Sequence, residues 1–122
     1  MFDSLFIKLI MNKKIAIPVN NGALDAHFGH TKQLAIFELE NSQIIDESVI
    51  DAPPHEPGLL PKLLSEKGVT DVIAGGMGAK AIQLFQRAGV NGFVGAPQLP
   101  VRNLVAGFIN KTISFSANYC DH

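Results

Sequence analysis

The feature that most constrains the fold is an apolar run that ends in a glycine turn and continues as a helical pattern, Val69-Thr-Asp-Val-Ile-Ala-Gly-Gly-Met-Gly-Ala-Lys-Ala-Ile82. Uninterrupted apolar residues such as Val72–Ala74 are typical of a parallel strand covered on both faces. Gly75, Gly76 and Gly78 allow a sharp turn and a close approach to a bound group, because they carry no Cβ. The unpaired N–H groups and the positive dipole end of the following helix face the same turn. The stretch therefore predicts an α/β fold with an anion-binding turn.

Composition describes an ordinary soluble chain that forms one domain. Of the 122 residues, 47% are hydrophobic and 17% are charged, which is typical of a globular protein. The formal net charge of −1 gives no general case for binding nucleic acid or an anionic membrane. Residues 69–122 hold four bases and two acids, whereas residues 1–68 hold six bases and nine acids. We therefore expect the half with the glycine turn to be electropositive.

The chain has a single cysteine, Cys120, which excludes an internal disulfide and suggests a reducing, cytoplasmic compartment. One thiolate also cannot hold an ordinary iron–sulfur cluster, which needs four. Residues 1–10 are apolar but are interrupted by Asp3 and Lys8, and they are too short to span a membrane. We expect residues 1–10 to be a disordered appendage or else an ordinary extra strand or helix. Residues 11–110 are expected to form the α/β domain, and residues 111–122 a C-terminal tail.

Periodicity and turn residues predict the element order β-ββ-α-β-α-β-α. Strands are expected at 14–19, 33–40, 43–50, 69–74 and 90–94, and helices at about 58–67, 79–88 and 101–108. The second and third strands form a hairpin, and the later βαβ units require right-handed parallel crossovers. These features predict a mixed, mostly parallel sheet with an N-terminal β-hairpin and helices on both faces. In the tail, the one strand-like run is 112–115.

Three loops are expected to share one rim of this sheet, because loops at the carboxyl ends of parallel strands gather at the same edge. They are the loop that holds His27 and His30, the turn Gly75–Gly78 and the turn Gly95–Pro100. We therefore expect the imidazole of His27 and the amide of Gly76 to lie at the same edge.

The glycine turn also fits a nucleotide pattern. Gly76-x-Gly78-x-x-Ala81 matches the dinucleotide fingerprint G-x-G-x-x-G/A. That fingerprint needs an acid about 20 residues further on to hold the ribose, and the residues from Gly95 to Arg102 include none. The spacing of a P-loop is absent around Lys80. A purely structural explanation, in which the glycines allow close packing of helix and sheet, also remains open.

Histidines supply the candidate metal ligands. His27 and His30 lie three residues apart in His27-Phe28-Gly29-His30, and neutral imidazole is a common metal ligand. His55 and the terminal Cys120-Asp121-His122 would complete a site only if the fold brings them together. The alternatives are a hydrogen-bonding role for each histidine and a loose tail at the C-terminus. We find no paired general acid and base and no Ser-His-Asp or Cys-His pattern, so we expect a protein that is not an enzyme.

Four short motifs occur in order over residues 14–108: Ile15-Ala-Ile-Pro-Val19, His27-Phe-Gly29, Leu60-Pro61 through Lys67-Gly-Val69, and Asp71-Val-Ile-Ala-Gly-Gly-Met-Gly78. With these motifs the chain resembles the dinitrogenase iron–molybdenum cofactor biosynthesis family. Its members carry or insert metal–sulfide clusters, and it includes the molybdenum–copper orange protein of anaerobic sulfate reducers. The resemblance implies a ribonuclease-H-like α/β fold with a cluster-binding groove. It also places the family's H-F-G histidine, implicated in holding the cofactor in some relatives, on His27.

The resemblance implies a non-enzymatic cytoplasmic carrier or scaffold for a molybdenum-containing metal–sulfide cluster, of the iron–molybdenum or molybdenum–copper type, bound non-covalently. The residues expected to contact it are His27, Phe28, Gly29, Gly75, Gly76, Met77 and Gly78, and the further metal ligands are His30, His55, Cys120 and His122. The expected partners are cluster donor or acceptor proteins or a P-loop ATPase, and neither nucleic acid nor a membrane. Two alternatives remain, a nucleotide-binding subunit that uses the glycine turn and an interaction adaptor that carries no cluster.

Overall fold

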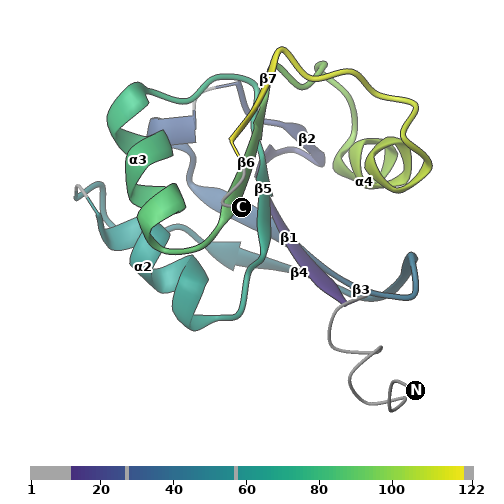
Figure 1. Cartoon of the computed structure of the whole chain (residues 1–122), viewed down its shortest axis with the longest axis horizontal. Helices are drawn as coiled ribbons and strands as arrows, with labels where there is room; N and C mark the ends of the chain where they lie inside the picture. The colour runs from purple at the N-terminus through teal and green to yellow at the C-terminus, as the bar shows by residue number, and fades with distance from the viewer. Residues whose placement is uncertain (1–11, 27, 57, 120–122) are drawn as a thin grey trace, which may run out of the picture.

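The structure is a computed structural model that describes residues 12–26, 28–56 and 58–119, which form a central sheet between helices (Figure 1). The strands are β1 (Lys13–Asn20), β2 (Ala23–Leu24), β3 (Gln33–Glu40), β4 (Gln43–Asp51), β5 (Asp71–Ile73), β6 (Asn91–Val94) and β7 (Ala117–Tyr119). They follow the spatial order β4-β3-β1-β5-β6-β7, and β2 pairs with β1 outside this path.

The middle of the sheet is parallel and its flanks are antiparallel. β1 pairs with β5, and β5 with β6, in parallel. β3 is antiparallel to both β1 and β4, and β7 is antiparallel to β6. Along the path, β1, β4, β5 and β6 therefore run in one direction, and β3 and β7 run in the other. This arrangement confirms the predicted mixed sheet in which most strands point the same way.

β3 and β4 form the antiparallel hairpin that the sequence predicts. Both turn residues have positive φ, 53° at Asn41 and 63° at Ser42, as a type I′ turn requires. The register shifts near the turn. Leu39 of β3 lies opposite Ile44, whereas its neighbour Glu38 lies opposite Asp46. Ile45 is therefore an extra residue on β4, and this bulge lies at one end of the outermost strand.

The connecting helices cover both faces of the sheet. They are the 3-10 turn η1 (Phe28–His30) and the α-helices α2 (Leu59–Glu66), α3 (Ala79–Arg87) and α4 (Val101–Asn110). α2 and α3 lie on one face, and α4 lies on the other (Figure 1). Each predicted helix is present, with ends close to those expected. Over the residues that the structure describes, no helix has the length and apolar character needed to cross a membrane.

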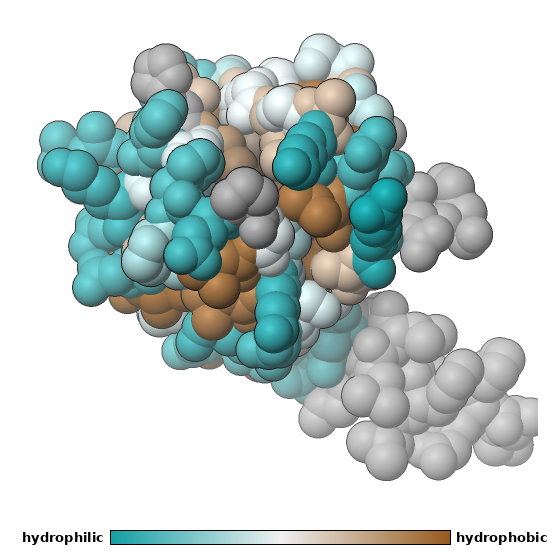
Figure 2. All heavy atoms as spheres, turned by 90° about the vertical axis from the view of Figure 1, so that its left-hand side faces the viewer, coloured by the Kyte–Doolittle hydropathy of each residue, from teal (hydrophilic) through white to brown (hydrophobic). Residues whose placement is uncertain are grey.

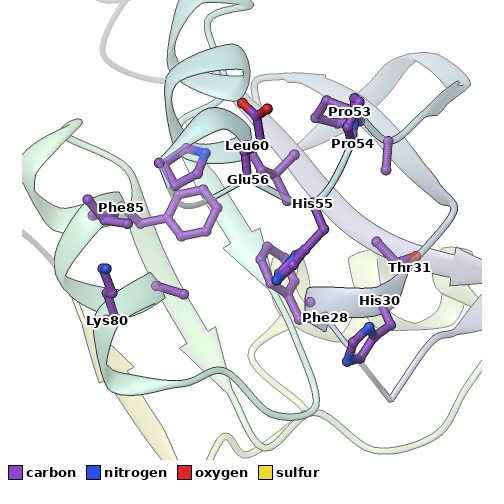
Figure 3. A pocket seen from close by; sticks show the side chains of 16 residues that line it. Phe28, His30, Thr31, Pro53, Pro54, His55, Glu56, Leu60, Lys80 and Phe85 are labelled. Atoms are coloured by element: carbon purple, nitrogen blue, oxygen red, sulfur yellow. The ribbon is translucent and has the colours of Figure 1, made fainter.

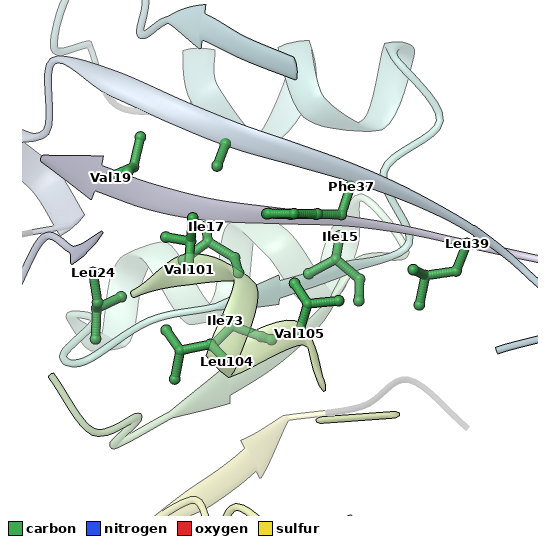
Figure 4. Packing of buried hydrophobic residues seen from close by; sticks show 11 residues of the cluster. Ile15, Ile17, Val19, Leu24, Phe37, Leu39, Ile73, Val101, Leu104 and Val105 are labelled. Carbon is green, nitrogen blue, oxygen red and sulfur yellow. The ribbon is translucent and has the colours of Figure 1, made fainter. Parts of the chain in front are cut away.

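Two separate cores follow from the alternation of side chains along the central strands. Ile15 and Ile17 of β1 are fully buried on the α4 side, where they pack with Leu104 and Val105 (Figure 4). The intervening residue of β1, Ala16, belongs to the core on the opposite face. Because successive strand residues point to opposite faces, one strand contributes to both cores.

The core beneath α2 and α3 contains the base of the candidate site. Leu64 of α2 and Phe85 of α3 are buried against the apolar residues of the sheet. The ring of Phe28 in η1 meets the ring of Phe85 edge to face, with centroids 5.6 Å apart and an interplanar angle of 71°. This contact fixes the position of η1 against α3.

The C-terminal segment corrects one expectation. The strand expected at 112–115 is wrong, because the segment that pairs with β6 is Ala117–Tyr119. Ile113 and Phe115 instead pack as irregular chain against the α4 core. Gly107 of α4 permits this approach, since a Cβ at that position would overlap the side chain of Ile113.

Candidate functional site

The loops that follow β1, β5 and β6 meet at the edge of the sheet where these parallel strands end. The amide of Gly95 donates a hydrogen bond of 2.8 Å to the carbonyl of Gly75, which joins the loops after β5 and β6. The amide of Leu24 donates one of 3.0 Å to the carbonyl of Leu99, which joins the loops after β1 and β6. The predicted convergence of the three loops is therefore confirmed for the described residues.

The glycine turn between β5 and α3 is open to solvent. Gly76 and Gly78 are exposed, and a Cβ built on either would meet no atom within 4 Å. A Cβ on Gly75 would instead lie 3.6 Å from Leu24 Cδ2 and 3.7 Å from the Cα of Ala26. Gly75 thus lies beside the loop after β1, whereas Gly76 and Gly78 leave space for a guest.

The helix that begins at this turn favours a negative charge at its first turn. Gly78 is its N-cap in an extended conformation, no side chain caps the helix, and the first turn has no acidic residue. The first N–H groups of a helix have no partner within the helix, and the positive end of its dipole lies there. Lys80 adds a positive charge to the same turn.

A cavity of about 410 Å³ lies beside this end of α3, between η1, α2 and the segment 52–56 (Figure 3). The apolar part of its lining includes Phe28, Leu60, Pro61, Leu84 and Phe85, and the polar part includes His30, Thr31, His55, Glu56 and Lys80. Apolar surface also appears between polar side chains on this side of the molecule (Figure 2). The cavity therefore offers an apolar interior with a polar rim that carries one lysine, one glutamate and two imidazoles.

Two of the predicted metal ligands come together on this rim. The rings of His30 and His55 are stacked, with centroids 5.8 Å apart and an interplanar angle of 29°. Gly29 lies close to this pair, since a Cβ there would be in van der Waals contact with His55 Cε1 at 3.6 Å. Lys80 faces the two histidines from the other side of the hollow (Figure 3). A guest in the cavity would therefore lie between an ammonium group and a pair of imidazoles.

The two histidines do not form a complete metal site by themselves. Within the described part of the chain, no group of three or more histidine, cysteine, aspartate or glutamate side chains could hold a metal ion. His27, Cys120 and His122 lie outside the described residues, so their proposed roles as ligands stay predictions. The pair is better suited to supply one or two exchangeable contacts to a preassembled group.

The predicted contact residues divide between the cavity and the turn beside it. Phe28 and Gly29 line the cavity, whereas Gly75–Gly78 precede the helix whose residues Lys80 and Ala81 line it. Met77 packs against the core beneath α2 and α3. Sequence reasoning missed Lys80 as a site residue. Its position in the first turn after the glycines was the signal that could have identified it.

Comparison with known proteins adds a family match to this geometry. A family model described as "Dinitrogenase iron-molybdenum cofactor" matches residues 11–111. A Methanocaldococcus jannaschii protein, MJ0580, whose function is uncharacterized, is 31% identical over 83 residues, which are 64% of this chain and 70% of that protein.

Solved structures share the fold at lower identity. The crystal structure of PH0822 has a TM-score of 0.78 at 23% identity and covers 84% of this chain and 94% of its own. The apo form of the orange protein from Desulfovibrio gigas has a TM-score of 0.71 at 22% identity and covers 86% and 93%. Both likenesses extend over most of this chain.

Proposed function

The chain belongs to the dinitrogenase iron-molybdenum cofactor family, and on this premise we propose that it binds and carries a molybdenum-containing metal–sulfide cluster. The cluster is cargo, of the iron–molybdenum or molybdenum–copper sulfide type, and it is held without covalent bonds. The protein acts as a carrier or scaffold that catalyses no reaction. Its strand order β4-β3-β1-β5-β6 is the basis for also proposing a ribonuclease-H-like fold.

The cavity beside α3 is the observation that carries this proposal. A metal–sulfide cluster is a preassembled anion with soft, polarisable sulfide edges. Leu60 and Leu84 offer apolar surface to those edges, and the uncapped first turn of α3 offers unpaired N–H groups to the negative charge. Lys80 adds a charge-assisted contact at the rim. Many weak contacts of this kind hold a cluster and still allow its release.

The imidazoles have a separate role in this proposal. His30 and His55, stacked on the rim, are positioned to offer displaceable bonds to a metal atom at the edge of the cluster. His27 remains the first candidate for such a bond. It directly follows Ala26 in the sequence, and Ala26 lies beside Gly75 of the glycine turn. The exposed backbone at Gly76 and Gly78, where a Cβ would meet no neighbour, leaves room for the cluster beside the cavity. We propose that cluster donor and acceptor proteins, or a P-loop ATPase, exchange the cargo in the cytoplasm of an anaerobe.

Reconstitution tests the proposal directly. Under anaerobic conditions, the protein is mixed with tetrathiomolybdate and a copper(I) salt, or with isolated iron–molybdenum cofactor, and then desalted. We expect a visible charge-transfer absorption and about one cluster per chain by metal analysis. A colourless protein free of molybdenum after both treatments would contradict the proposal.

Lys80→Gln locates the binding site. Loss of its charge should weaken retention of the cluster by about five- to tenfold, because one charge-assisted contact is removed. Arg87→Gln is the matched control, since Arg87 is an exposed base in the last turn of the same helix and does not line the cavity. Equal losses in the two variants would place the cluster elsewhere.

A nucleotide is the second candidate ligand. Gly76-x-Gly78-x-x-Ala81 does lie between a strand and a helix, as the dinucleotide fingerprint requires. The missing ribose acid argues against it. Calorimetry with NAD and with ATP distinguishes the two candidates, because the cluster carrier should release no heat with either nucleotide.

A further inference from the structure

The outer edge of β4 carries an unusual apolar surface. Among the described residues, the large hydrophobic side chains that are exposed are Ile45 and Val49, with 53% and 55% of their surface accessible. Both lie on β4, which is the terminal strand of the sheet and pairs with β3 on one side. A long edge strand with unpaired N–H and C=O groups is a template for a further strand. Ile45 and Val49 therefore expose apolar surface beside an edge that is open to a further strand.

The sequence of β4 is complementary to itself in one antiparallel register. If two copies pair about a two-fold axis through Glu47, Ile45 of each copy lies opposite Val49 of the other. The same register places Asp46 opposite Ser48. Apolar residues therefore meet apolar residues, and Asp46 meets a neutral polar side chain. Cross-strand pairs of these kinds stabilise a sheet, whereas like charges directly opposite destabilise it.

Neighbouring two-fold registers lack this complementarity. An axis through Asp46 places Val49 opposite Gln43 and Ile45 opposite Glu47. An axis through Ser48 places Ile45 opposite Asp51 and Val49 opposite Glu47. Each alternative sets the apolar side chains against polar or charged ones, so the pattern of β4 selects the axis at Glu47.

The remaining like-charge contact is the pair of Glu47 side chains at the axis, and the fold provides a counter-charge for it. Arg102 Nε of α4 donates a hydrogen bond of 2.8 Å to Glu47 Oε2, and Arg102 Nη2 forms an ion pair of 2.7 Å with the same oxygen. This hydrogen bond and the charge of Glu47 raise the pKa of Arg102 above its usual value. Each copy would therefore bring a paired carboxylate to the axis.

We propose that two copies of this chain associate through β4, antiparallel and about a two-fold axis at Glu47, so that their sheets become one continuous sheet. Ile45 is the bulge residue itself, so the Ile45–Val49 pairs lie at the two ends of the seam, and β4 pairs regularly with β3 only from Asp46 to Asp51. This surface is separate from the cluster-binding cavity. The dimer is formed by the protein without its cargo, so the two proposals fail independently.

Two lysine substitutions on the same strand test the register. Val49→Lys should raise the dimer dissociation constant by about tenfold or more, because a charge replaces the apolar partner of Ile45. Ser48→Lys should lower it, because in this register the new ammonium group faces Asp46 of the second copy. Sedimentation velocity over a range of protein concentrations measures both, and circular dichroism confirms that each variant is folded. A wild-type chain that stays monomeric at millimolar concentration would overturn the proposal.

Cysteine crosslinking tests whether the two-fold axis of the proposed dimer lies at Glu47. In a Cys120→Ser background, Glu47→Cys should form a disulfide-linked dimer on mild oxidation, because directly opposed residues of antiparallel strands have Cα atoms about 4.5–5.5 Å apart. Ser48→Cys is the matched control and should crosslink far less, since it faces Asp46 and not itself. Equal crosslinking in the two variants, or a dimer whose dissociation constant Val49→Lys leaves unchanged, would show that β4 is not the interface.

Discussion

Asp71 is the charged side chain that the fold buries completely, with no accessible surface among the described residues. The hydroxyl of Thr70 donates to its carboxylate over 2.6 Å, and the side-chain amide of Asn91 donates over 3.1 Å. Lys13 Nζ lies 3.7 Å from the same group. These partners come from β1, the start of β5 and the start of β6, so Asp71 joins three strands at the edge opposite the cavity. Its role is structural.

Replacement of Asp71 by Asn should lower the free energy of unfolding by about 2 kcal/mol, because hydrogen bonds to a buried charged group are lost and an amide donor is left facing other donors. Urea denaturation measures this change. Glu66→Gln is the control, since Glu66 is exposed at the end of α2 and should change the stability by less than about 0.5 kcal/mol. Equal stability of the Asp71 variant and the wild type would show that the hydrogen bonds of Asp71 do not stabilise the fold.

Sequence alone identified the chemistry of the site residues better than their grouping. His30 and His55 were recognised as possible ligands, but they are separated by the whole β3–β4 hairpin. Their stacking depends on where β4 returns the chain after the hairpin, and local patterns do not encode that position. Lys80 was counted only as one base in an electropositive half of the chain. Its contribution to the cavity depends on how α3 packs against η1.

At the scale of elements, Gly95 and Gly107 position the C-terminal segment, because each lies where an added Cβ would overlap a residue of that segment. Gly95, with φ of +81°, lies against Ser116, where an added Cβ would overlap both the side chain and the backbone nitrogen. The amide of Ser116 donates to the carbonyl of Val94 over 2.9 Å and leads the chain into β7. The prediction of a strand at 112–115 was wrong because Ile113 and Phe115 pack against the α4 core. The pairing with β6 begins only at Ala117.

The two costs of a side chain at Gly95 can be separated by mutation. Gly95→Ala should destabilise the fold by more than Gly68→Ala, because both positions have φ of +81° but a Cβ at Gly68 meets nothing within 4 Å. The strain of the left-handed conformation is about 1–2 kcal/mol in either variant. The overlap with Ser116 adds to it in Gly95→Ala alone. Thermal unfolding of the two variants measures the difference, and equal midpoints would show that the segment moves away without loss.

At the scale of the whole molecule, the sheet separates two cores, and the cavity belongs to one of them. The apolar runs and their alternation made this arrangement predictable, including the helices on both faces and the order of the elements. The antiparallel flank at β7 and the 3-10 turn η1 were not predicted. Each is held by tertiary contacts, as the Phe28–Phe85 ring contact shows for η1.

Substitutions in the two cores should therefore differ in their effect on the cargo. Leu104→Ala removes a fully buried side chain from the α4 side and should lower stability by about 2–5 kcal/mol. The folded fraction should bind the cluster with unchanged affinity, because the cavity lies across the sheet. Leu84→Ala alters the cavity wall itself and should weaken binding at a smaller loss of stability, because Leu84 is only partly buried. Titration of both variants under folding conditions separates the effects, and equal affinities would contradict the division.

The wall of the cavity that follows β4 includes Pro53 and Pro54 in succession. Proline fixes its own φ and restricts the residue before it, so this stretch has little conformational freedom to lose when a guest arrives. A preorganised binding surface loses little conformational entropy when a ligand binds. The same stiffness means that unloading requires no large opening motion. If the cavity binds the proposed cluster, this part of its wall should therefore rearrange little on loading or release.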